Sequence, residues 1–219
     1  MPNKADSVKH RVGYFKNQRS EMLQYIPKGT MKLLEVGCGE GNFLSLLNNE
    51  QQELWGIELN SDAAAQAKSK FKNIFSGSFE SNFENLPKDY FDCIVFNDVL
   101  EHMYSPWDVI AACKKLLNTN GVIVSSIPNF RYISNLITEI VLKGEFEYKP
   151  GGGILDDTHI RFFTSKSIKR MYAEQGYSIL KHEGVHTCKS WKEKLCIFLS
   201  FGILKDSKYK QFATVAKPN

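Results

Sequence analysis

Short apolar runs alternate with segments of helical periodicity along most of the chain. Apolar runs bounded by glycine, asparagine or charged residues predict strands that are covered on both faces. The segments between them predict amphipathic helices, and this alternation is typical of an α/β protein with a doubly wound, mostly parallel sheet. The expected strands are residues 32–36, 54–58, 73–76, 93–97 and 121–127, and the expected helices start near residue 41 and cover 61–71 and 106–117.

Turn and capping residues separate these elements. Pro106 suits the first turn of its helix, and the Asn-Thr-Asn-Gly of residues 118–121 predicts the end of that helix and a turn. Thr164 or Ser165 can cap a helix over 166–175. Two further strands are expected at 177–184 and 211–216, with an apolar helix over 191–204 between them.

The length of 219 residues is enough for one substantial core and too short for two ordinary domains. We expect residues 1–30 to form a helical cap and residues 31–219 to form the main domain. Glycine and proline residues near 143–163 predict a flexible loop that meets the substrate. A mostly apolar stretch near 189–205 predicts a helical insertion.

Composition narrows the class of protein. The formal net charge of +4 is modest and the lysines near the C-terminus are typical of a solvated surface, so we expect no nucleic-acid partner. Five cysteines, odd in number and widely spaced, predict free thiols in a reducing compartment. The N-terminus lacks the apolar core of a signal peptide and no run is long enough to span a bilayer, so the expected location is cytoplasmic.

The strongest candidate site follows the first expected strand. Residues 33–36 run into a turn with glycines at positions 37, 39 and 41, which allow positive φ and close approach of the backbone to a ligand. Glu58 ends the second strand about 20 residues later, where such folds place an acceptor for ribose hydroxyls. Because the glycine spacing departs from the dinucleotide pattern GxGxxG, the sequence indicates a nucleotide site that is not an NAD site.

Four segments resemble one family in its order. Residues 35–41, Glu-Val-Gly-Cys-Gly-Glu-Gly, resemble motif I of the class I S-adenosylmethionine-dependent methyltransferases. Residues 56–60, 91–102 and 121–129 resemble the family's acidic second-strand end, fourth-strand motif and fifth strand, so the resemblance covers residues 30–185. It implies a Rossmann-like seven-stranded sheet with an antiparallel last strand, and an enzyme that uses S-adenosyl-L-methionine and releases S-adenosyl-L-homocysteine.

The resemblance also assigns residues to the cofactor. The glycine turn would offer backbone contacts, and Glu58 would accept hydrogen bonds from both ribose hydroxyls. Adenine would lie after the third strand, where the aspartate often found in this family is missing and Phe79 is equally well explained as a core residue. Tyr14, with Phe15 and Arg19, would close over the cofactor. The implied cofactor residues are Gly37, Cys38, Gly39, Gly41, Asn42, Glu58, Leu59, Ser78, Phe79, Asn97, Asp98, Val99 and Tyr14.

Two histidines are candidates for the base that removes a proton from the acceptor. His102 follows the fourth strand, and His159 lies in the segment 156–164, Asp-Asp-Thr-His-Ile-Arg-Phe-Phe-Thr. Imidazole side chains titrate near neutral pH, which suits proton abstraction. The resemblance places His159 over the acceptor pocket with Asp157 and Arg161, whereas a structural role is the alternative for His102.

A partial metal motif overlaps the fourth-strand segment. Asp98, Glu101 and His102 partly resemble the Glu-x-x-Glu-His segment that binds a divalent ion in ubiquinone-pathway O-methyltransferases. The first acid is shortened to aspartate here, and Glu-His is common in relatives that need no metal. We therefore expect no metal.

The segments 156–164 and 128–132 resemble small-molecule methyltransferases that are often associated with bacterial surface-polysaccharide and sugar modification. The first expectation is therefore O-methylation of a hydroxyl on a sugar, glycan or related metabolite, with quinone precursors second. A small-molecule N-methyltransferase and a catalytically inactive cofactor-binding subunit of a larger assembly stay open. An RNA or protein methyltransferase is disfavoured, because residues 97–100, Asn-Asp-Val-Leu, lack the motif used for planar nitrogens.

The apolar helix 191–204 has two interpretations. In the first it packs against the body of the protein or against a homodimer partner. In the second it makes peripheral contact with a membrane or a lipid-linked substrate. It is too short to span a bilayer, so we do not expect stable membrane insertion.

Overall fold

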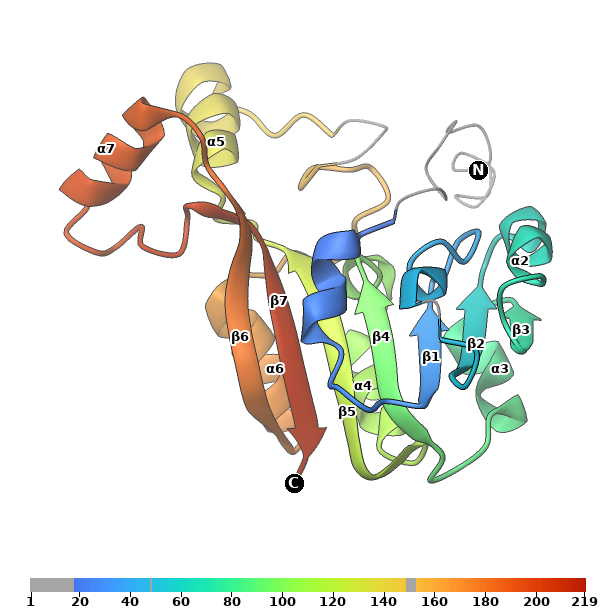
Figure 1. The fold of residues 1–219 in the computed structure, drawn as a ribbon. Coiled ribbons are helices and arrows are strands. Elements are labelled where there is room, and N and C mark those ends of the chain that lie inside the picture. The colour runs from blue at the N-terminus through green and yellow to red at the C-terminus, as the bar shows by residue number, and fades with distance from the viewer. Residues whose placement is uncertain (1–17, 48, 149–152) are drawn as a thin grey trace.

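The computed structural model of the chain describes residues 18–47, 49–148 and 153–219. Within these residues, seven strands form one sheet in the order β3-β2-β1-β4-β5-β7-β6 (Figure 1). β7 runs antiparallel to both of its neighbours and the other neighbouring pairs are parallel, which confirms the predicted sheet. The strands are β1 (Lys32–Val36), β2 (Glu53–Glu58), β3 (Asn73–Ser76), β4 (Phe91–Asn97), β5 (Leu117–Pro128), β6 (Tyr177–Thr187) and β7 (Tyr209–Pro218).

The central strands are apolar on both faces because helices cover both sides of the sheet. Leu34 of β1 lies in one buried cluster and its neighbour Leu33 in the other, as the two-residue period of a strand requires. In β4, Ile94 and Val95 divide in the same way. The first cluster lies against α3 (Phe79–Asn82), α4 (Pro106–Cys113) and α6 (Ser165–Glu174), and the second against α2 (Ser61–Ala67) and the 3₁₀ helices η2 (Ser20–Tyr25) and η3 (Leu44–Leu47).

Three expected helices are shorter in the structure than in the prediction. The helix expected from residue 41 is a turn followed by the short helix η3, and α2 ends at Ala67 before a turn. Helix α4 begins at Pro106 as expected, but it ends at Cys113 because Leu117 already pairs with Phe91 in the sheet. A residue that local propensity assigns to a helix can therefore be paired in the sheet instead.

The polar residues 118–121 lie inside β5 and not between two elements, so the predicted turn is wrong in its placement. The ladder between β4 and β5 is interrupted there, because Phe91 pairs with Leu117 and Cys93 already pairs with Val122. The Asn118 amide donates to Asp92 Oδ1 at 2.5 Å within this irregularity. The turn-forming sequence thus produces a bulge that keeps the strand in the sheet.

Helix α6 begins as its sequence predicts. Thr164 is the N-cap, its hydroxyl accepts from Ser167 N at 3.2 Å, and the Ser167 hydroxyl accepts from Thr164 N at 2.8 Å. This reciprocal pair satisfies two helix-end amides and selects Thr164 over Ser165 as the cap. The helix ends at Glu174, and Gly176 follows with φ 66°.

Two helical segments stand apart from the sheet at the upper left of Figure 1. One is α5 (Ile133–Asn135), which continues as the π-helix η6 (Leu136–Lys143), and the other is α7 (Trp191–Leu199). The insertion expected near 189–205 is therefore a helix shorter than 191–204, followed by turns. Two short 3₁₀ helices complete the described elements, η4 (Phe83–Asn85) and η5 (Leu100–His102).

The described part of the expected N-terminal cap is η2 with its flanking residues. Met22 and Tyr25 of this helix are buried against the sheet, and the Tyr25 hydroxyl donates to Glu183 Oε2 at 3.2 Å. Tyr14 and Phe15, which the sequence assigns to cofactor closure, lie outside the described residues.

Candidate functional site

The glycine turn connects β1 to η3 at the carboxyl edge of the sheet. Gly37, Gly39 and Gly41 have φ of 72°, 54° and 74°, a region that side chains other than glycine rarely adopt. A Cβ on Gly37 would lie 2.5 Å from Val99 Cγ2, so the turn is packed directly against the segment that follows β4. The sequence therefore holds the backbone of this turn close to the ends of two neighbouring strands.

Cys38 belongs to this turn, and its side chain is buried between the turn and β2. A Cβ on Gly56 would lie 2.8 Å from Cys38 Sγ, which leaves the thiol no room to turn outward on that side. Burial raises the pKa of the Cys38 thiol, and the nearby charges of Glu35 and Glu58 raise it further. An unreactive packed thiol results, which leaves only the main chain of Cys38 for ligand contacts.

Glu58 ends β2 beside the glycine turn. Its Oε2 accepts from Gly39 N at 2.8 Å, and its Oε1 accepts from Asn60 N at 2.8 Å. Burial raises the pKa of Glu58, while hydrogen bonds from backbone amides act in the opposite direction. A carboxylate has about four lone-pair sites, so both oxygens can still accept bonds from a ligand. The exposed side chain of Leu59 follows directly.

Glu35 is a buried acid before the glycine turn that the sequence analysis did not select as a candidate. It is 2% exposed in the middle of β1, and its Oε2 has no hydrogen-bond partner among the described residues. Burial raises the pKa of Glu35 to about 8, and the Leu44 backbone acts in the opposite direction. The sequence signal for Glu35 is a single acid inside an otherwise apolar strand. Burying a carboxyl group costs free energy unless the group binds a ligand or joins a hydrogen-bond network.

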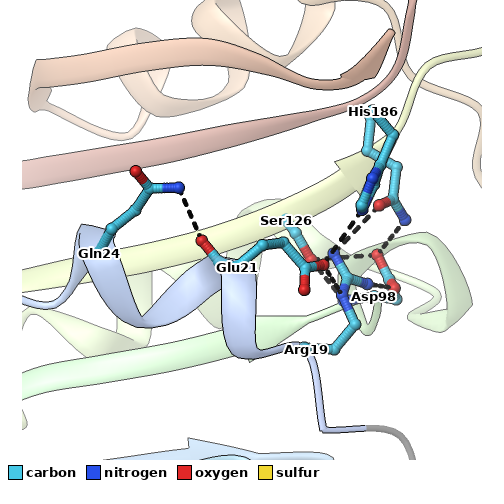
Figure 2. Close-up of polar contacts among 7 residues, drawn as sticks. Arg19, Glu21, Gln24, Asp98, Ser126 and His186 are labelled. Carbon is cyan, nitrogen blue, oxygen red and sulfur yellow. Dashed lines mark hydrogen bonds and ion pairs between the residues drawn. The ribbon is translucent and has the colours of Figure 1, made fainter. Parts of the chain in front are cut away.

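Asp98 lies at the end of β4 in the network of Figure 2. Its backbone has φ 55°, and its N donates to Ser126 O at 3.1 Å. The Ser126 hydroxyl and the Gln211 amide donate to Asp98 Oδ1 at 3.1 and 2.8 Å. Arg19 forms an ion pair with Oδ2, so three distant segments of the chain contact one carboxylate.

Arg19 connects this network to the N-terminal segment (Figure 2). Its Nε donates to Glu21 Oε1 at 2.8 Å, and its Nη2 donates to Gln211 Oε1 at 3.0 Å. His186 Nε2 lies 3.2 Å from the same Glu21 oxygen. These bonds hold the segment that precedes η2 against the ends of β4 and β7. Ser126 and Gln211 belong to the same network, although no local sequence signal marks either residue.

The two residues expected near adenine, Ser78 and Phe79, have different surroundings in the structure. Ser78 caps α3 through a bond from Ser81 N at 3.2 Å. Phe79 is 3% exposed and packs against Phe83 and Phe96 in the core, with ring centroids 5.7 and 6.5 Å apart. This packing matches the core interpretation of Phe79. Asn42, expected in the glycine turn, accepts from Lys70 Nζ at 2.6 Å.

Glu101, His102 and His159 form a cluster where β4 meets the loop before α6. The two imidazole rings lie 4.7 Å apart edge to face, and His159 Nε2 lies 3.9 Å from Glu101 Oε1. Each Nδ1 faces a backbone carbonyl oxygen, Thr158 O at 3.2 Å for His102 and Ile154 O at 2.9 Å for His159. Because a carbonyl only accepts, each Nδ1 carries the proton in the neutral ring, and Nε2 of His159 is then the acceptor nitrogen of its ring.

Glu101 is the most deeply buried member of this cluster. It is 1% exposed, and neither carboxylate oxygen has a hydrogen-bond partner among the described residues. Burial raises the pKa of Glu101 to about 8, with the Arg19 charge lowering it and the Asp156 charge raising it. The ligand atoms of Glu101, His102 and His159 all lie within 4.8 Å of one another, so they could hold a divalent cation. Asp98, the expected first acid of that motif, is instead paired with Arg19.

The other expected substrate residues point in different directions. Arg161 donates through Nε to Tyr104 O at 3.1 Å and lies 6.0 Å from the Trp107 ring. Asp157 is exposed, whereas its neighbour Asp156 is 2% exposed and accepts from Thr158 N at 2.9 Å. The structure therefore places Asp156, which the sequence analysis did not select, beside the histidine cluster.

Aromatic side chains gather next to this loop. Phe130, which follows β5, packs against Phe162 and Phe146 with centroids 5.1 and 5.8 Å apart. Tyr148 packs against Phe162 at 6.5 Å. Phe146 and Tyr148 are half exposed, so the cluster offers accessible ring faces.

Comparison with known proteins identifies the domain. A family model described as methyltransferase domain matches residues 8–182. The chain is 30% identical over 112 residues to the ubiquinone biosynthesis O-methyltransferase of Pasteurella multocida, a match that covers 45% of this chain and 46% of that protein. It is 25% identical over 158 residues to the protein of the same name in Thiobacillus denitrificans, covering 68% of this chain and 66% of that protein. The matched region thus spans between about half and two thirds of these relatives.

A solved structure shows the same fold. The chain superposes on a SAM-dependent methyltransferase from Archaeoglobus fulgidus with a TM-score of 0.70 and 22% identity, over 94% of this chain and 96% of that one. The match to the family model includes the glycine turn, Glu58, Arg19, Asp98 and the histidine cluster. The chain therefore belongs to the methyltransferase domain family and has the fold of the class I S-adenosylmethionine-dependent methyltransferases.

Proposed function

We propose that this chain transfers a methyl group from S-adenosylmethionine to a hydroxyl of a small molecule. The observation that carries the proposal is the meeting of two sites at one edge of the sheet. The glycine turn and Glu58 lie at the carboxyl ends of β1 and β2, and the histidine cluster lies just beyond the end of β4. Ligands of parallel α/β sheets bind at this edge.

The residues present fit the cofactor. Gly37 and Gly39 give the turn beside the site its positive φ, and Glu58 presents acceptor oxygens suited to ribose hydroxyls. Asp98, which also pairs with Arg19, supplies negative charge that suits a cationic amino group, and the unpartnered oxygen of Glu35 offers a hydrogen-bond acceptor. When bound, the cofactor supplies a methyl group on an already electrophilic sulfur, so the protein mainly positions the acceptor and removes its proton.

His159 is the proposed base. Its Nε2 has a free electron pair, since Nδ1 donates to Ile154 O at 2.9 Å. A proton taken up at Nε2 lies 3.9 Å from Glu101 Oε1, and Glu101 in its ionised form would stabilise the imidazolium. His102 packs edge to face against His159 and is proposed to position it.

The acceptor is proposed to be a ring-bearing small molecule. The exposed faces of Phe146, Phe162 and Tyr148 suit stacking against a sugar or an aromatic ring. A sugar or glycan hydroxyl is the acceptor expected from the sequence. A phenolic quinone precursor is the second candidate, which the aromatic cluster and the names of the curated relatives favour.

The cellular setting follows the chemistry. Within the described residues all five cysteines are free, and four of them are buried, which supports the proposal of a reducing, cytoplasmic location. We also propose that the segment around Arg19 belongs to a cap that closes over the bound cofactor, because it already contacts Asp98.

The experiment that tests this function has two stages. Calorimetric titration with S-adenosylmethionine and S-adenosylhomocysteine should show binding by the wild type. Transfer of a radiolabelled methyl group is then measured with nucleotide sugars and with catechols, before and after exhaustive chelation, and we expect transfer that chelation does not change. Methylated amines as the only products would support the N-methyltransferase alternative. Cofactor binding without transfer to any acceptor would favour the inactive subunit, and no binding by a folded protein would overturn the proposal.

A further inference from the structure

An apolar arm, residues 189–206, projects from the body of the protein. It consists of α7 and the turns that follow it, at the upper left of Figure 1. No residue of α7 is buried, although its sequence Trp-Lys-Glu-Lys-Leu-Cys-Ile-Phe-Leu is largely apolar. Phe198 is 80% exposed, Phe201 95% and Ile203 74%. Helices that are apolar around most of their surface are normally buried, so this arm requires a partner.

The arm is anchored at its base and is not a fraying end. Cys188 N donates to Lys208 O at 2.8 Å, which pairs the two chain segments that enter and leave it. Arg131 Nη2 donates to Ile203 O at 2.6 Å and lies 3.6 Å from Asp206. These bonds hold the arm to the chain after β5, so its exposed apolar tip is a fixed feature of the surface.

Positive charge surrounds the apolar tip. Lys189, Lys192, Lys194 and Lys205 are exposed, and none of them forms an ion pair within the described part of the chain. The acids of the arm are Glu193 and Asp206, and Asp206 already faces Arg131. The uncompensated charge of the arm is therefore positive, which complements an anionic surface.

Aromatic and aliphatic side chains flanked by lysines are suited to a membrane interface. No helix in the described residues is long and apolar enough to cross a bilayer. A short helix of this composition instead lies at the boundary of headgroups and acyl chains, with its lysines near lipid phosphates.

We propose that the arm docks this protein on an anionic lipid surface. Phe198, Phe201 and Ile203 enter the interfacial region of the bilayer, and the lysines bind the headgroups. Exposed apolar residues also occur on η6, which lies beside α7 in Figure 1, where Val141 and Leu142 are 72% and 74% exposed. Docking depends on the arm alone and is independent of methyl transfer.

The test is co-sedimentation of the full chain with vesicles of phosphatidylcholine, with and without phosphatidylglycerol. We expect binding to the anionic vesicles that weakens as salt is raised. The double variant Phe198→Ser, Phe201→Ser should bind at least about tenfold more weakly. Leu180→Ser is the matched control, because Leu180 is 60% exposed on β6, away from the arm, and should bind like the wild type.

Charge and self-association provide the remaining arms of the test. Lys192→Gln should weaken binding to anionic vesicles roughly fivefold without changing cofactor binding. Circular dichroism and cofactor calorimetry establish that each variant is folded. Equal sedimentation of the wild type and the double variant would overturn the proposal. So would a wild-type dimer, seen by light scattering, that ignores vesicles and becomes monomeric in Phe201→Ser, because the arm would then be a contact between copies.

Discussion

Arg19 and Asp98 form an ion pair between Arg19 Nη1 and Asp98 Oδ2 that joins the N-terminal segment to the carboxyl end of β4. Both residues have positive φ, 44° and 55°. This region costs a residue other than glycine roughly 1–2 kcal/mol, so the bonds from Ser126 and Gln211 must hold the strained backbone. The carboxylate held at this position is the one proposed to bind the amino group of the cofactor.

Asp98→Asn tests the role of that charge. Asparagine tolerates positive φ and keeps an acceptor oxygen, so the backbone geometry is retained while the negative charge is lost. We expect affinity for S-adenosylhomocysteine to fall about tenfold in calorimetry, because a charge-assisted bond to the amino group is removed. Asp92→Asn, at the opposite end of β4, is the control. Unchanged affinity in Asp98→Asn would show that Asp98 serves only the Arg19 network.

Glu58→Ala should weaken cofactor binding without unfolding the protein. Loss of hydrogen bonds from two hydroxyls to a carboxylate costs about 1–3 kcal/mol, or about tenfold to a hundredfold in affinity. Calorimetry of the variant beside Glu84→Gln, whose carboxylate is exposed on η4, separates this effect from a change in overall charge. A variant that binds as tightly as the wild type would remove Glu58 from the ribose site.

His159→Gln should lower the rate of methyl transfer to a hydroxyl about a hundredfold, because glutamine cannot take up the proton. Cofactor affinity should stay the same, since His159 lies in the acceptor cluster with Glu101. His102→Gln is expected to have the smaller effect on kcat, because it acts through the position of His159. The kinetic measurement is kcat against pH, and equal rates for wild type and His159→Gln would exclude this base.

Gly37→Ala and Gly144→Ala separate backbone strain from steric conflict. The φ is 72° at Gly37 and 71° at Gly144. Only a Cβ on Gly37 would meet a neighbour, Val99 Cγ2 at 2.5 Å. Gly144→Ala should lose about 1 kcal/mol of unfolding free energy, and Gly37→Ala about 2–4 kcal/mol, because overpacking is added to strain. Urea denaturation measures both. Equal losses would mean that the turn and Val99 can move apart at little cost.

Glu35 makes the stability of the protein depend on pH. Burial raises the pKa of Glu35 to about 8 from its ordinary value of 4.5, so the folded state binds more protons than the unfolded state between these values. The free energy of unfolding contributed by this group therefore falls as pH rises through that window. Glu35→Gln, which stays neutral, should flatten the pH dependence of urea denaturation, whereas the exposed Glu84→Gln should leave it unchanged. If Glu35→Gln has the same pH dependence of unfolding free energy as the wild type, the proposal that Glu35 is neutral in the folded state is wrong.

The sequence by itself determined the strands and the glycine turn, because both depend on signals between near neighbours. An apolar run that meets three glycines, as at Gly37 to Gly41, specifies a buried strand and a tight turn wherever it is placed. The Thr164 cap of α6 is equally local. Element boundaries were less certain, since Leu117 is a helix residue by propensity and a strand residue by pairing with Phe91.

Only the tertiary structure decided which side chains meet at the site. Arg19, Asp98 and Gln211 are far apart in sequence. No pattern near any of them predicts that the Asp98 carboxylate contacts both Arg19 and Gln211. The same is true of Glu101 and His159, which become a pair only when the loop before α6 returns to the end of β4. The physical reason is that local propensity fixes backbone conformation over a few residues, whereas burial and charge pairing depend on the order of the strands in the sheet.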